Sequence, residues 1–204
     1  FLLENVIEKK DPSNNSINID VKNKVKSNNS KKVINRSGIR KLNSLRSMLL
    51  NFFRFNQKPI IIGIAGDSGS GKDTLSDSLE SLIGSHSAVK LSGDDYHRWD
   101  RQGPMWQVMT HINPMANDLH SFSNDLISLR DGKEINQRHY DHETGKMTKP
   151  RLIKSNQFIL VSGLHTFSLP ITRDACNLKI FLDIDEDLRR FFKIRRDVHE
   201  RTYY

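Results

Sequence analysis

Four short apolar runs rich in Ile, Leu and Val recur from residue 60 onward. They lie at 60–65, 88–92, 158–161 and 178–184. A short continuous run of this kind is typical of a strand buried on both faces of a parallel sheet. Helix-spaced patterns lie at 74–83, 117–129 and 186–200. Strands that alternate with helices predict an α/β fold with a mainly parallel sheet flanked by helices. Residues 133–146 predict a short hairpin that turns at Thr144 and Gly145.

The first 58 residues have a different pattern. Residues 9–37 are rich in Asn, Lys and Ser, and they carry too little apolar surface to offset the entropy of ordering them. Apolar residues return at helical spacing across 39–55, which predicts an amphipathic helix that packs on the following domain or lies on a membrane surface. We therefore expect three parts. They are 1–37, the tail of a possible upstream domain plus a flexible Asn- and Lys-rich linker; 38–58, the amphipathic helix; and 59–204, the P-loop domain.

The net charge of +8 comes from the N-terminal arm. Residues 1–59 contain 13 Lys and Arg against 4 Asp and Glu, whereas the rest of the chain contains 19 against 20. The flexible stretch at residues 9–37 contains no aromatic residue on which bases could stack, so nucleic acid is not an expected partner. A solvated tether is the favoured interpretation of the arm.

Two further features limit the class of protein. No apolar run approaches the roughly 20 residues of a membrane helix, so we expect no membrane span. Cys176 is the only cysteine, which excludes a disulfide within the chain. An unpaired thiol favours a reducing compartment, and we expect the cytoplasm.

The strongest chemical signal follows the first apolar run. Residues 66–72 read G-D-S-G-S-G-K, and a strand, a G-x-x-x-x-G-K run and a helix in that order predict a phosphate-binding loop. Glycines let backbone N–H groups surround phosphate oxygens, the helix N-terminus adds a positive dipole, and Lys72 places a cation against the phosphates. The predicted nucleotide-binding residues are Gly66, Asp67, Ser68, Gly69, Ser70, Gly71, Lys72, Asp73 and Thr74.

Acidic residues near this loop point to phosphoryl transfer with a metal ion. Asp73 stands where the pattern has a Ser or Thr hydroxyl for Mg²⁺, and Thr74 follows it. A carboxylate can bind Mg²⁺ directly, although it can also repel the phosphates. Asp94 follows the run at 88–92, at the sheet edge where α/β proteins bind ligands, and could accept the proton of an attacking hydroxyl. We expect Asp73, Thr74 and Asp94 near Mg²⁺, with Asp94 and Lys72 as the catalytic residues.

Six segments in order resemble the phosphoribulokinase and uridine kinase family of P-loop kinases. They are IIGIAGDSGSGKDT, LSGDDYHRWDR, THINPMAND, YDHETGK, FILVSGLH and KIRRDVHER, across residues 60–201. The third and fourth segments resemble the phosphoribulokinase branch more than the uridine kinase branch. The resemblance implies a P-loop kinase domain over 59–204, incomplete at its C-terminal end, that uses ATP and Mg²⁺ and phosphorylates a small-molecule acceptor.

The resemblance also implies roles for single residues. Asp94 matches the family's catalytic base, which takes the proton from the acceptor hydroxyl. His97 and Arg101 match positions that contact the sugar phosphate. The further residues that match stretches lining the acceptor pocket are His111, Tyr140 and His142. Those that match basic residues closing on the nucleotide phosphates are Arg196 and Arg201.

Three positions depart from the family's pattern. The strand at 158–161 is usually followed by a glutamate, but Ser162 stands there, and Asp73 replaces a hydroxyl residue. One hypothesis is that the two sites have exchanged roles, with Asp73 as the metal carboxylate; the alternative is a decayed site with little or no turnover. Chloroplast phosphoribulokinases carry a switching cysteine within the phosphate loop, where this chain has Ser70, so no disulfide switch is expected.

Three functions follow from this sequence. The leading one is an ATP-dependent kinase that transfers the γ-phosphoryl group to a hydroxyl of a small sugar phosphate or polyol. A uridine or other nucleoside kinase is the alternative on the same fold, although His97 and Arg101 favour an anionic acceptor. The third is a non-catalytic nucleotide-binding module fused to an upstream enzyme. The sequence leaves open both such a fusion and a homodimer.

Overall fold

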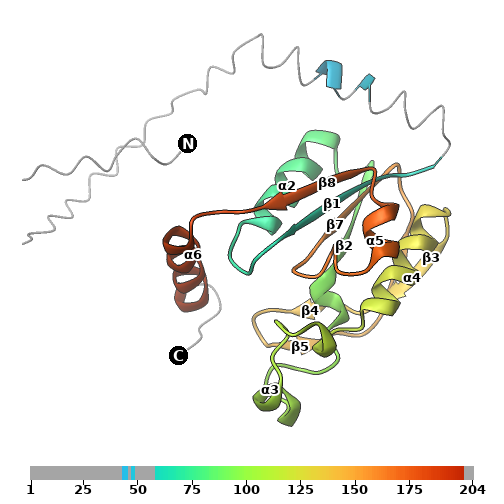
Figure 1. Cartoon of the computed structure of the whole chain (residues 1–204). Helices are drawn as coiled ribbons and strands as arrows, with labels where there is room; N and C mark the ends of the chain where they lie inside the picture. Colours follow the sequence, from blue (N-terminus) through green and yellow to red (C-terminus); the bar gives the residue numbers. More distant parts are fainter. Residues whose placement is uncertain (1–42, 46, 49–57, 200–204) are drawn as a thin grey trace, which may run out of the picture.

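A computed structural model describes residues 43–45, 47–48 and 58–199 (Figure 1). The predicted arm at 1–37 and most of the predicted helix at 38–58 lie outside these residues. Residues 43–45 and 47–48 are helical, and the side chains of Leu45 and Met48 are exposed. Packing of this helix on the domain stays a prediction. None of the described helices combines the length and the hydropathy needed to cross a bilayer.

A parallel sheet of four strands forms the centre of the domain. Its strands are β1 (Ile60–Gly66), β2 (Ala88–Ser92), β7 (Phe158–Ser162) and β8 (Leu178–Leu182). They lie in the order β2-β7-β1-β8, and every neighbouring pair is parallel. The predicted parallel sheet and its four strands are confirmed. The last strand ends at Leu182, two residues before the predicted end.

Alternate residues of β1 pack into two different layers of helices. Ile60, Ile62 and Ile64 belong to a cluster that includes α2 (Lys72–Ile83), whereas Ile61 packs in the cluster that includes α4 (Leu119–Arg130). In Figure 1, α2 lies on one side of the sheet, and α4 and α5 (Pro170–Ala175) lie on the other. Burial of one Ile side chain stabilises the folded state by about 1.5–3 kcal/mol, so burial on both faces of the sheet explains the continuous apolar run.

The predicted hairpin at 133–146 is wrong in its pairing. Two antiparallel ladders form instead. They join β3 (Glu134–Gln137) to β6 (Arg151–Lys154), and β4 (Tyr140–Asp141) to β5 (Lys146–Met147). The turn at Thr144 and Gly145 does close the second ladder. Ile135 and Ile153 stand opposite each other and join the α4 cluster, so burial of this pair decides which strand β3 takes as its partner.

The remaining elements bring loop residues toward the ends of the strands. They are the 3₁₀ turns η1 (Gly93–Tyr96) and η2 (Pro114–Ala116), the helix α3 (Pro104–Val108) and the helix α6 (Glu186–His199). The predicted helices at 74–83, 117–129 and 186–200 correspond to α2, α4 and α6. Helix α6 lies beyond the ends of β1 and β8, beside the loop that follows β1 (Figure 1).

Candidate active site

A cavity of about 950 Å³ lies at the carboxyl ends of the central strands. Its lining includes Ser92 at the end of β2, Ser162 at the end of β7, Leu182 at the end of β8 and the loop residues after β1. The carboxyl ends of parallel strands meet at one edge of the sheet, which is where α/β proteins bind ligands. Residues far apart in the sequence therefore share one wall.

The loop between β1 and α2 has the backbone of an anion-binding nest. Gly69 and Gly71 both have a φ of +88°. The left-handed conformation of Gly71 immediately precedes α2, whose first N–H groups have no acceptor within the helix. A residue with a Cβ is strained at this φ, so glycine is required there. The arrangement presents N–H groups and a positive helix dipole to an anion.

Ser70 contributes a buried hydroxyl to the same loop. Its Oγ has no hydrogen-bond partner among the described residues, and Ser70 lines the cavity. An unpaired buried polar group costs about 1–3 kcal/mol, and a phosphate oxygen accepting from this hydroxyl would remove that penalty. Gly66 has to lack a side chain, because a Cβ there would lie 2.5 Å from the Leu182 carbonyl oxygen and 2.8 Å from Ser70 Oγ.

Lys72 is folded back onto its own loop. Its Nζ donates to the Asp67 carbonyl oxygen at 2.7 Å. Burial lowers the pKa of Lys72, although the carboxylates of Asp94 and Asp73 act in the opposite direction and the charge of Arg196 adds to the lowering. An anion arriving in the cavity would stabilise this ammonium, so the lysine is suited to holding a phosphate.

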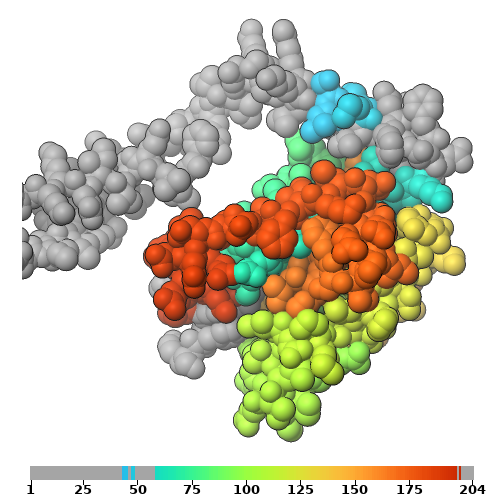
Figure 2. All heavy atoms as spheres, viewed as in Figure 1, coloured from blue at the N-terminus to red at the C-terminus, as the bar shows by residue number. Residues whose placement is uncertain are grey.

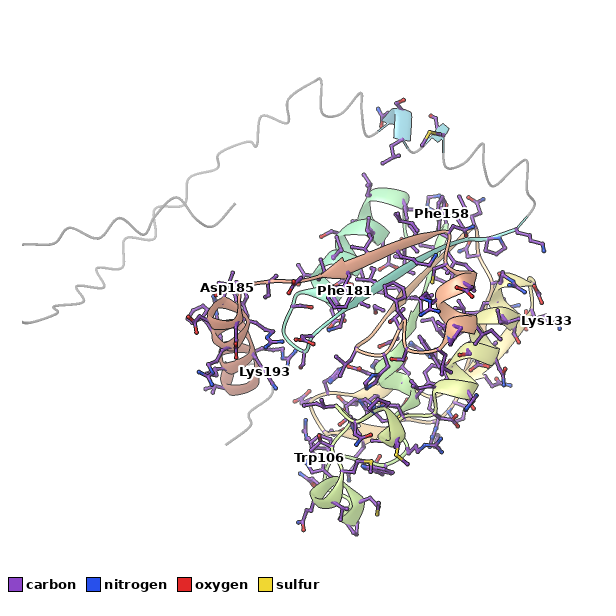
Figure 3. The ribbon with its side chains drawn as sticks, viewed as in Figure 1. Trp106, Lys133, Phe158, Phe181, Asp185 and Lys193 are labelled. Atoms are coloured by element: carbon purple, nitrogen blue, oxygen red, sulfur yellow. The ribbon has the colours of Figure 1, made fainter. Side chains whose placement is uncertain are left out.

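Helix α6 packs directly on the phosphate loop. Arg189 forms an ion pair with Asp67, and a Cβ at Gly69 would lie 3.2 Å from Lys193 Cβ. Figure 2 shows the red atoms of α6 beside the teal atoms that follow β1, and Lys193 lies on the side of α6 nearest that loop in Figure 3. Lys193 and Arg196 both line the cavity, so the helix adds positive charge beside the N–H groups of the loop.

Asp94 lies in the first turn after β2 and also lines the cavity. Its Oδ2 lies 3.2 Å from His142 Nε2, and its backbone N–H donates to Ser92 Oγ at 3.3 Å. Burial acts to raise the pKa of Asp94, but the hydrogen bond from His142 and the positive charge of Lys72 act against it, and the pKa lies below its ordinary value. The carboxylate is therefore ionised at neutral pH and can orient a hydroxyl group.

The neighbouring Asp95 holds two segments of the fold together and does not face the cavity. Its Oδ1 accepts hydrogen bonds from the Tyr140 N–H at 2.7 Å and from His139 Nδ1 at 3.0 Å. Burial raises the pKa of Asp95 despite the hydrogen bond from Tyr140. Asp95 does not line the cavity and instead ties β4 to the turn after β2.

Opposite the phosphate loop, four rings form one packed cluster. His97 stacks on His111 with ring centroids 3.5 Å apart, and Tyr140 and Trp106 meet His111 edge-on at 5.5 Å and 4.6 Å. Burial lowers the pKa of His97, and burial together with His97 lowers the pKa of His111 to about 4. Both imidazoles are therefore neutral at pH 7 and add no full charge to the pocket.

Arg101 joins this cluster to the β4–β5 hairpin. Its guanidinium donates to the carbonyl oxygens of His142 and Glu143, both at 3.1 Å. These bonds hold the backbone of His142, whose ring contacts Asp94. Arg101 lines the cavity as well, so it places a permanent positive charge in the acceptor half while it positions the hairpin.

The cavity wall offers few protein ligands for a magnesium ion, as expected when the nucleotide phosphates supply the others. Asp73, Thr74 and Asp94 supply two carboxylates and a hydroxyl to the cavity wall. The described part of the chain holds no cluster of three or more His, Cys, Asp or Glu that could hold a metal. Mg²⁺ usually takes only one or two protein carboxylates and completes its shell with phosphates and water, so this sparse set is compatible with it.

The cavity brings together most of the residues predicted from the sequence. Those that line it are Ser68, Gly69, Ser70, Gly71, Lys72, Asp73, Thr74, Asp94, His97, Arg101, His111, Tyr140, His142 and Arg196. Gly66 and Asp67 are absent from its lining. Gly66 leaves room for Ser70 Oγ, and the carbonyl oxygen of Asp67 accepts from Lys72. Arg201 lies outside the described residues. The roles of all these residues stay predictions.

Several lining residues were not predicted. They include Asn117, Trp106, Thr110, His165 and Lys193. Asn117 lies within the segment THINPMAND, in which His111 is the predicted site residue. Trp106 comes from α3, a helix of five residues that no periodic pattern reveals. A polar residue in a family segment and an isolated Trp near it were the only signals in the sequence.

Comparison with known proteins supports one family. The model of the "Phosphoribulokinase / Uridine kinase family" matches residues 61–204. A phosphoribulokinase of Synechocystis sp. is 34% identical over 144 residues, which cover 71% of this chain and 43% of the relative. A uridine kinase of Ligilactobacillus salivarius is 32% identical over 147 residues, which cover 71% of this chain and 69% of the relative.

A solved structure supports the fold. The phosphoribulokinase from Rhodobacter spheroides has a TM-score of 0.57 and 23% sequence identity, and the match covers 72% of this chain and 58% of that one. The chain spans less than half the length of the Synechocystis relative. Because relatives of both branches are similarly identical, identity does not separate the branches. The family model nevertheless covers the cavity and all of the sheet except Ile60, so the chain belongs to the phosphoribulokinase and uridine kinase family.

Proposed function

We propose that this protein is an ATP-dependent kinase that transfers the γ-phosphoryl group to a hydroxyl of a small sugar phosphate or polyol. The observation that carries the proposal is that the phosphate loop with Lys72 and the carboxylate of Asp94 line one cavity. The charge of Asp94 is close enough to act on the pKa of Lys72. A nucleotide held by the loop and a hydroxyl held by Asp94 would therefore meet.

The residues divide into nucleotide and acceptor functions. The N–H groups around Gly69 and Gly71, Ser70 Oγ and Lys72 Nζ would hold the ATP phosphates, and Arg196 would add charge from α6. Asp73, Thr74 and Asp94 would hold Mg²⁺, which would supply positive charge next to the phosphates. Asp94 would align the acceptor hydroxyl and take its proton while the new P–O bond forms and the bond from the γ-phosphorus to the bridging oxygen breaks, which releases ADP.

Arg101 supports an anionic acceptor over a neutral one. Arginine is always charged and binds phosphate groups through several N–H donors. His97 and His111 are neutral, so Arg101 contributes the fixed cation among the predicted acceptor residues. This distribution supports a phosphoribulokinase-like acceptor that carries its own phosphate group.

A nucleoside kinase is the second candidate. The aromatic wall formed by His97, His111, Tyr140 and Trp106 supports it, because flat rings can stack on a base. A wall of this kind can also hold the carbon skeleton of a sugar. The acceptor itself therefore has to separate the two candidates.

The test measures ADP release with Mg²⁺ and ATP in the presence of ribulose 5-phosphate, uridine, glycerate or an alditol phosphate. A sugar phosphate or alditol phosphate as the best acceptor would support the proposal, and uridine as the best acceptor would replace it with the second candidate. Calorimetric binding of Mg·ATP with no ADP release from any acceptor would instead indicate a non-catalytic nucleotide-binding module.

The roles of Asp73 and Ser162 are part of this proposal. Both line the cavity, and Asp73 is exposed whereas Ser162 is buried. We infer that Asp73 supplies the carboxylate for Mg²⁺ and that Ser162 supplies a hydroxyl. Asp73→Ser should then weaken the dependence of ATP binding on Mg²⁺. A structure with Mg·ATP in which Asp73 Oδ lies more than about 4 Å from the metal, beyond inner-sphere reach, would contradict the exchange.

A further inference from the structure

Asn117 has only one way to orient its amide. Its Nδ2 donates to the carbonyl oxygens of His111 at 2.9 Å and Asn113 at 2.8 Å. Carbonyl oxygens can only accept, so the NH₂ group has to face them and Oδ1 faces the other way. Oδ1 lies 2.6 Å from Nδ1 of His97, and Asn117 is 4% exposed. No bulk water competes for this contact.

The orientation of Asn117 decides where His97 carries its proton. An amide oxygen accepts and cannot donate, so Nδ1 of His97 has to be the protonated nitrogen. In a neutral imidazole the other nitrogen, Nε2, then has a free lone pair. Asp94, His142 and His165 act electrostatically on this ring, yet burial is the largest influence and lowers its pKa.

Packing holds the ring of His97 in place. It stacks on His111 with an interplanar angle of 24°, and Tyr140 meets it edge-on with centroids 4.7 Å apart. His111 has the opposite tautomer, because its Nε2 lies 2.9 Å from the Trp99 carbonyl oxygen and has to donate to it. The two stacked rings are thus each fixed by one acceptor oxygen. His97 lines the cavity, and its Nδ1 is occupied by Asn117.

We propose that Asn117 is a positioning residue that fixes the tautomer of His97, so that Nε2 of His97 accepts a hydrogen bond from a hydroxyl of the acceptor. This inference rests on the proposed kinase function. A neutral Nε2 with a lone pair cannot donate to a phosphate oxygen, so His97 recognises a hydroxyl and leaves the anionic group of the acceptor to Arg101. The acceptor class is a polyol that presents a second hydroxyl beside the one that reacts.

The tautomer can be measured without any substrate. In protein labelled with ¹⁵N-histidine, long-range ¹H–¹⁵N spectra at alkaline pH distinguish a protonated Nδ1 from a protonated Nε2, and His97→Gln identifies the signals among the 8 histidines. The wild type should show His97 protonated at Nδ1. Asn117→Ala should lose that state, because it removes the oxygen that accepts from Nδ1 of His97. An Nε2-protonated His97 in the wild type would overturn the proposal.

A matched variant separates the tautomer from simple loosening of the loop. Asn113→Ala removes the side chain whose Oδ1 accepts from the Met115 N–H, so it loosens η2 without touching His97. It should leave the His97 spectrum unchanged. If Asn113→Ala alters the tautomer as much as Asn117→Ala does, Asn117 has no specific role.

Kinetics then test the consequence for the acceptor. With whichever acceptor the wild type phosphorylates, Asn117→Ala should raise the acceptor KM by about tenfold, the effect of one lost hydrogen bond, and leave the ATP KM within about twofold. An unchanged acceptor KM in Asn117→Ala would refute the role of Nε2. If no acceptor is phosphorylated, the proposed function fails and the spectra alone decide the tautomer.

Discussion

The cavity has a predicted nucleotide half, lined by the loop after β1, and a predicted acceptor half, lined by His97, His111 and Tyr140. The two halves use different chemical groups. The predicted phosphate loop would bind through backbone N–H groups of seven consecutive residues, 66–72, whose conformation depends on glycine. The acceptor half consists of buried side chains from separate segments, which include His97, His111 and Tyr140. A continuous loop is specified locally, whereas the ring cluster exists only when several loops pack together.

The two halves also treat charge differently. Lys72, Lys193 and Arg196 make the nucleotide half cationic. In the acceptor half, burial keeps His97 and His111 neutral, and Asp94 stays ionised. Phosphoryl transfer needs both conditions, because the phosphates require neutralisation and the hydroxyl requires an acceptor for its proton. The four predictions that follow test this division, beginning with the largest expected effect.

Asp94→Asn should abolish most of the chemistry while the fold persists. Loss of a proton acceptor at this position should lower kcat by roughly 10²–10⁴-fold, and calorimetry should still detect Mg·ATP binding. The matched variant is Asp95→Asn, in which the amide oxygen still accepts from the Tyr140 N–H. Asp95→Asn should lower the melting temperature and should leave kcat much closer to the wild-type value than Asp94→Asn does. Equal kcat values for Asp94→Asn and the wild type would contradict the assignment of the base.

Stability should fall as the pH decreases from 6.5 to 4. His111 has an ordinary pKa of 6.5 and a pKa of about 4 in the fold, so in this window the unfolded chain binds a proton that the folded chain does not. His97 and His165 act in the same direction because their pKa values are also lowered.

His111→Gln isolates the contribution of one ring to that pH dependence. Chemical denaturation of the wild type and of this variant at several pH values should give curves that differ by roughly 2–3 kcal/mol across the window, with the wild type losing more stability as the pH falls. Parallel curves would show that His111 is not held neutral by the fold.

Gly71→Ala should weaken nucleotide binding through backbone strain alone. The φ of +88° disfavours a Cβ by about 1–2 kcal/mol, and no atom within 4 Å would clash with it. The Kd for Mg·ATP should rise roughly 5–30-fold. Gly132→Ala is the control, because Gly132 has a φ of +78° and equally open surroundings but does not line the cavity. It should reduce stability and leave the Kd unchanged.

Arg189→Ala should have the smallest effect. The ion pair between Arg189 and Asp67 has partners that are 31% and 57% exposed, so it contributes less than about 1 kcal/mol. Titration calorimetry should show at most an approximately fivefold change in the Kd for Mg·ATP, and the change should shrink at high salt. Arg173→Ala, which removes an exposed pair with Asp174, provides the comparison. A loss of more than about tenfold would show that α6 is held on the loop mainly by this pair.

Sequence reasoning was accurate for the parallel sheet, for the glycine-rich loop between a strand and a helix, and for the position of Asp94 directly after a strand. These features depend on local signals: continuous apolar runs for strands buried on both faces, glycine spacing for the loop, and a carboxylate directly after a strand. It failed for the hairpin at 133–146, since β3 and β6 are joined across an intervening ladder by burial of Ile135 against Ile153. It also missed α3, which is too short to show a helical period.

The sequence by itself determined that the chain has an α/β fold, that residues 66–72 form a glycine-rich loop between a strand and a helix, and that an aspartate stands at the neighbouring strand end. Only the tertiary structure decided that His97 and His111 stack as neutral rings, that Asn117 accepts from Nδ1 of His97, and that Arg101 holds the hairpin bearing His142. The physical reason is that pKa values and tautomers depend on burial and on partners from distant segments, which no spacing along the chain encodes.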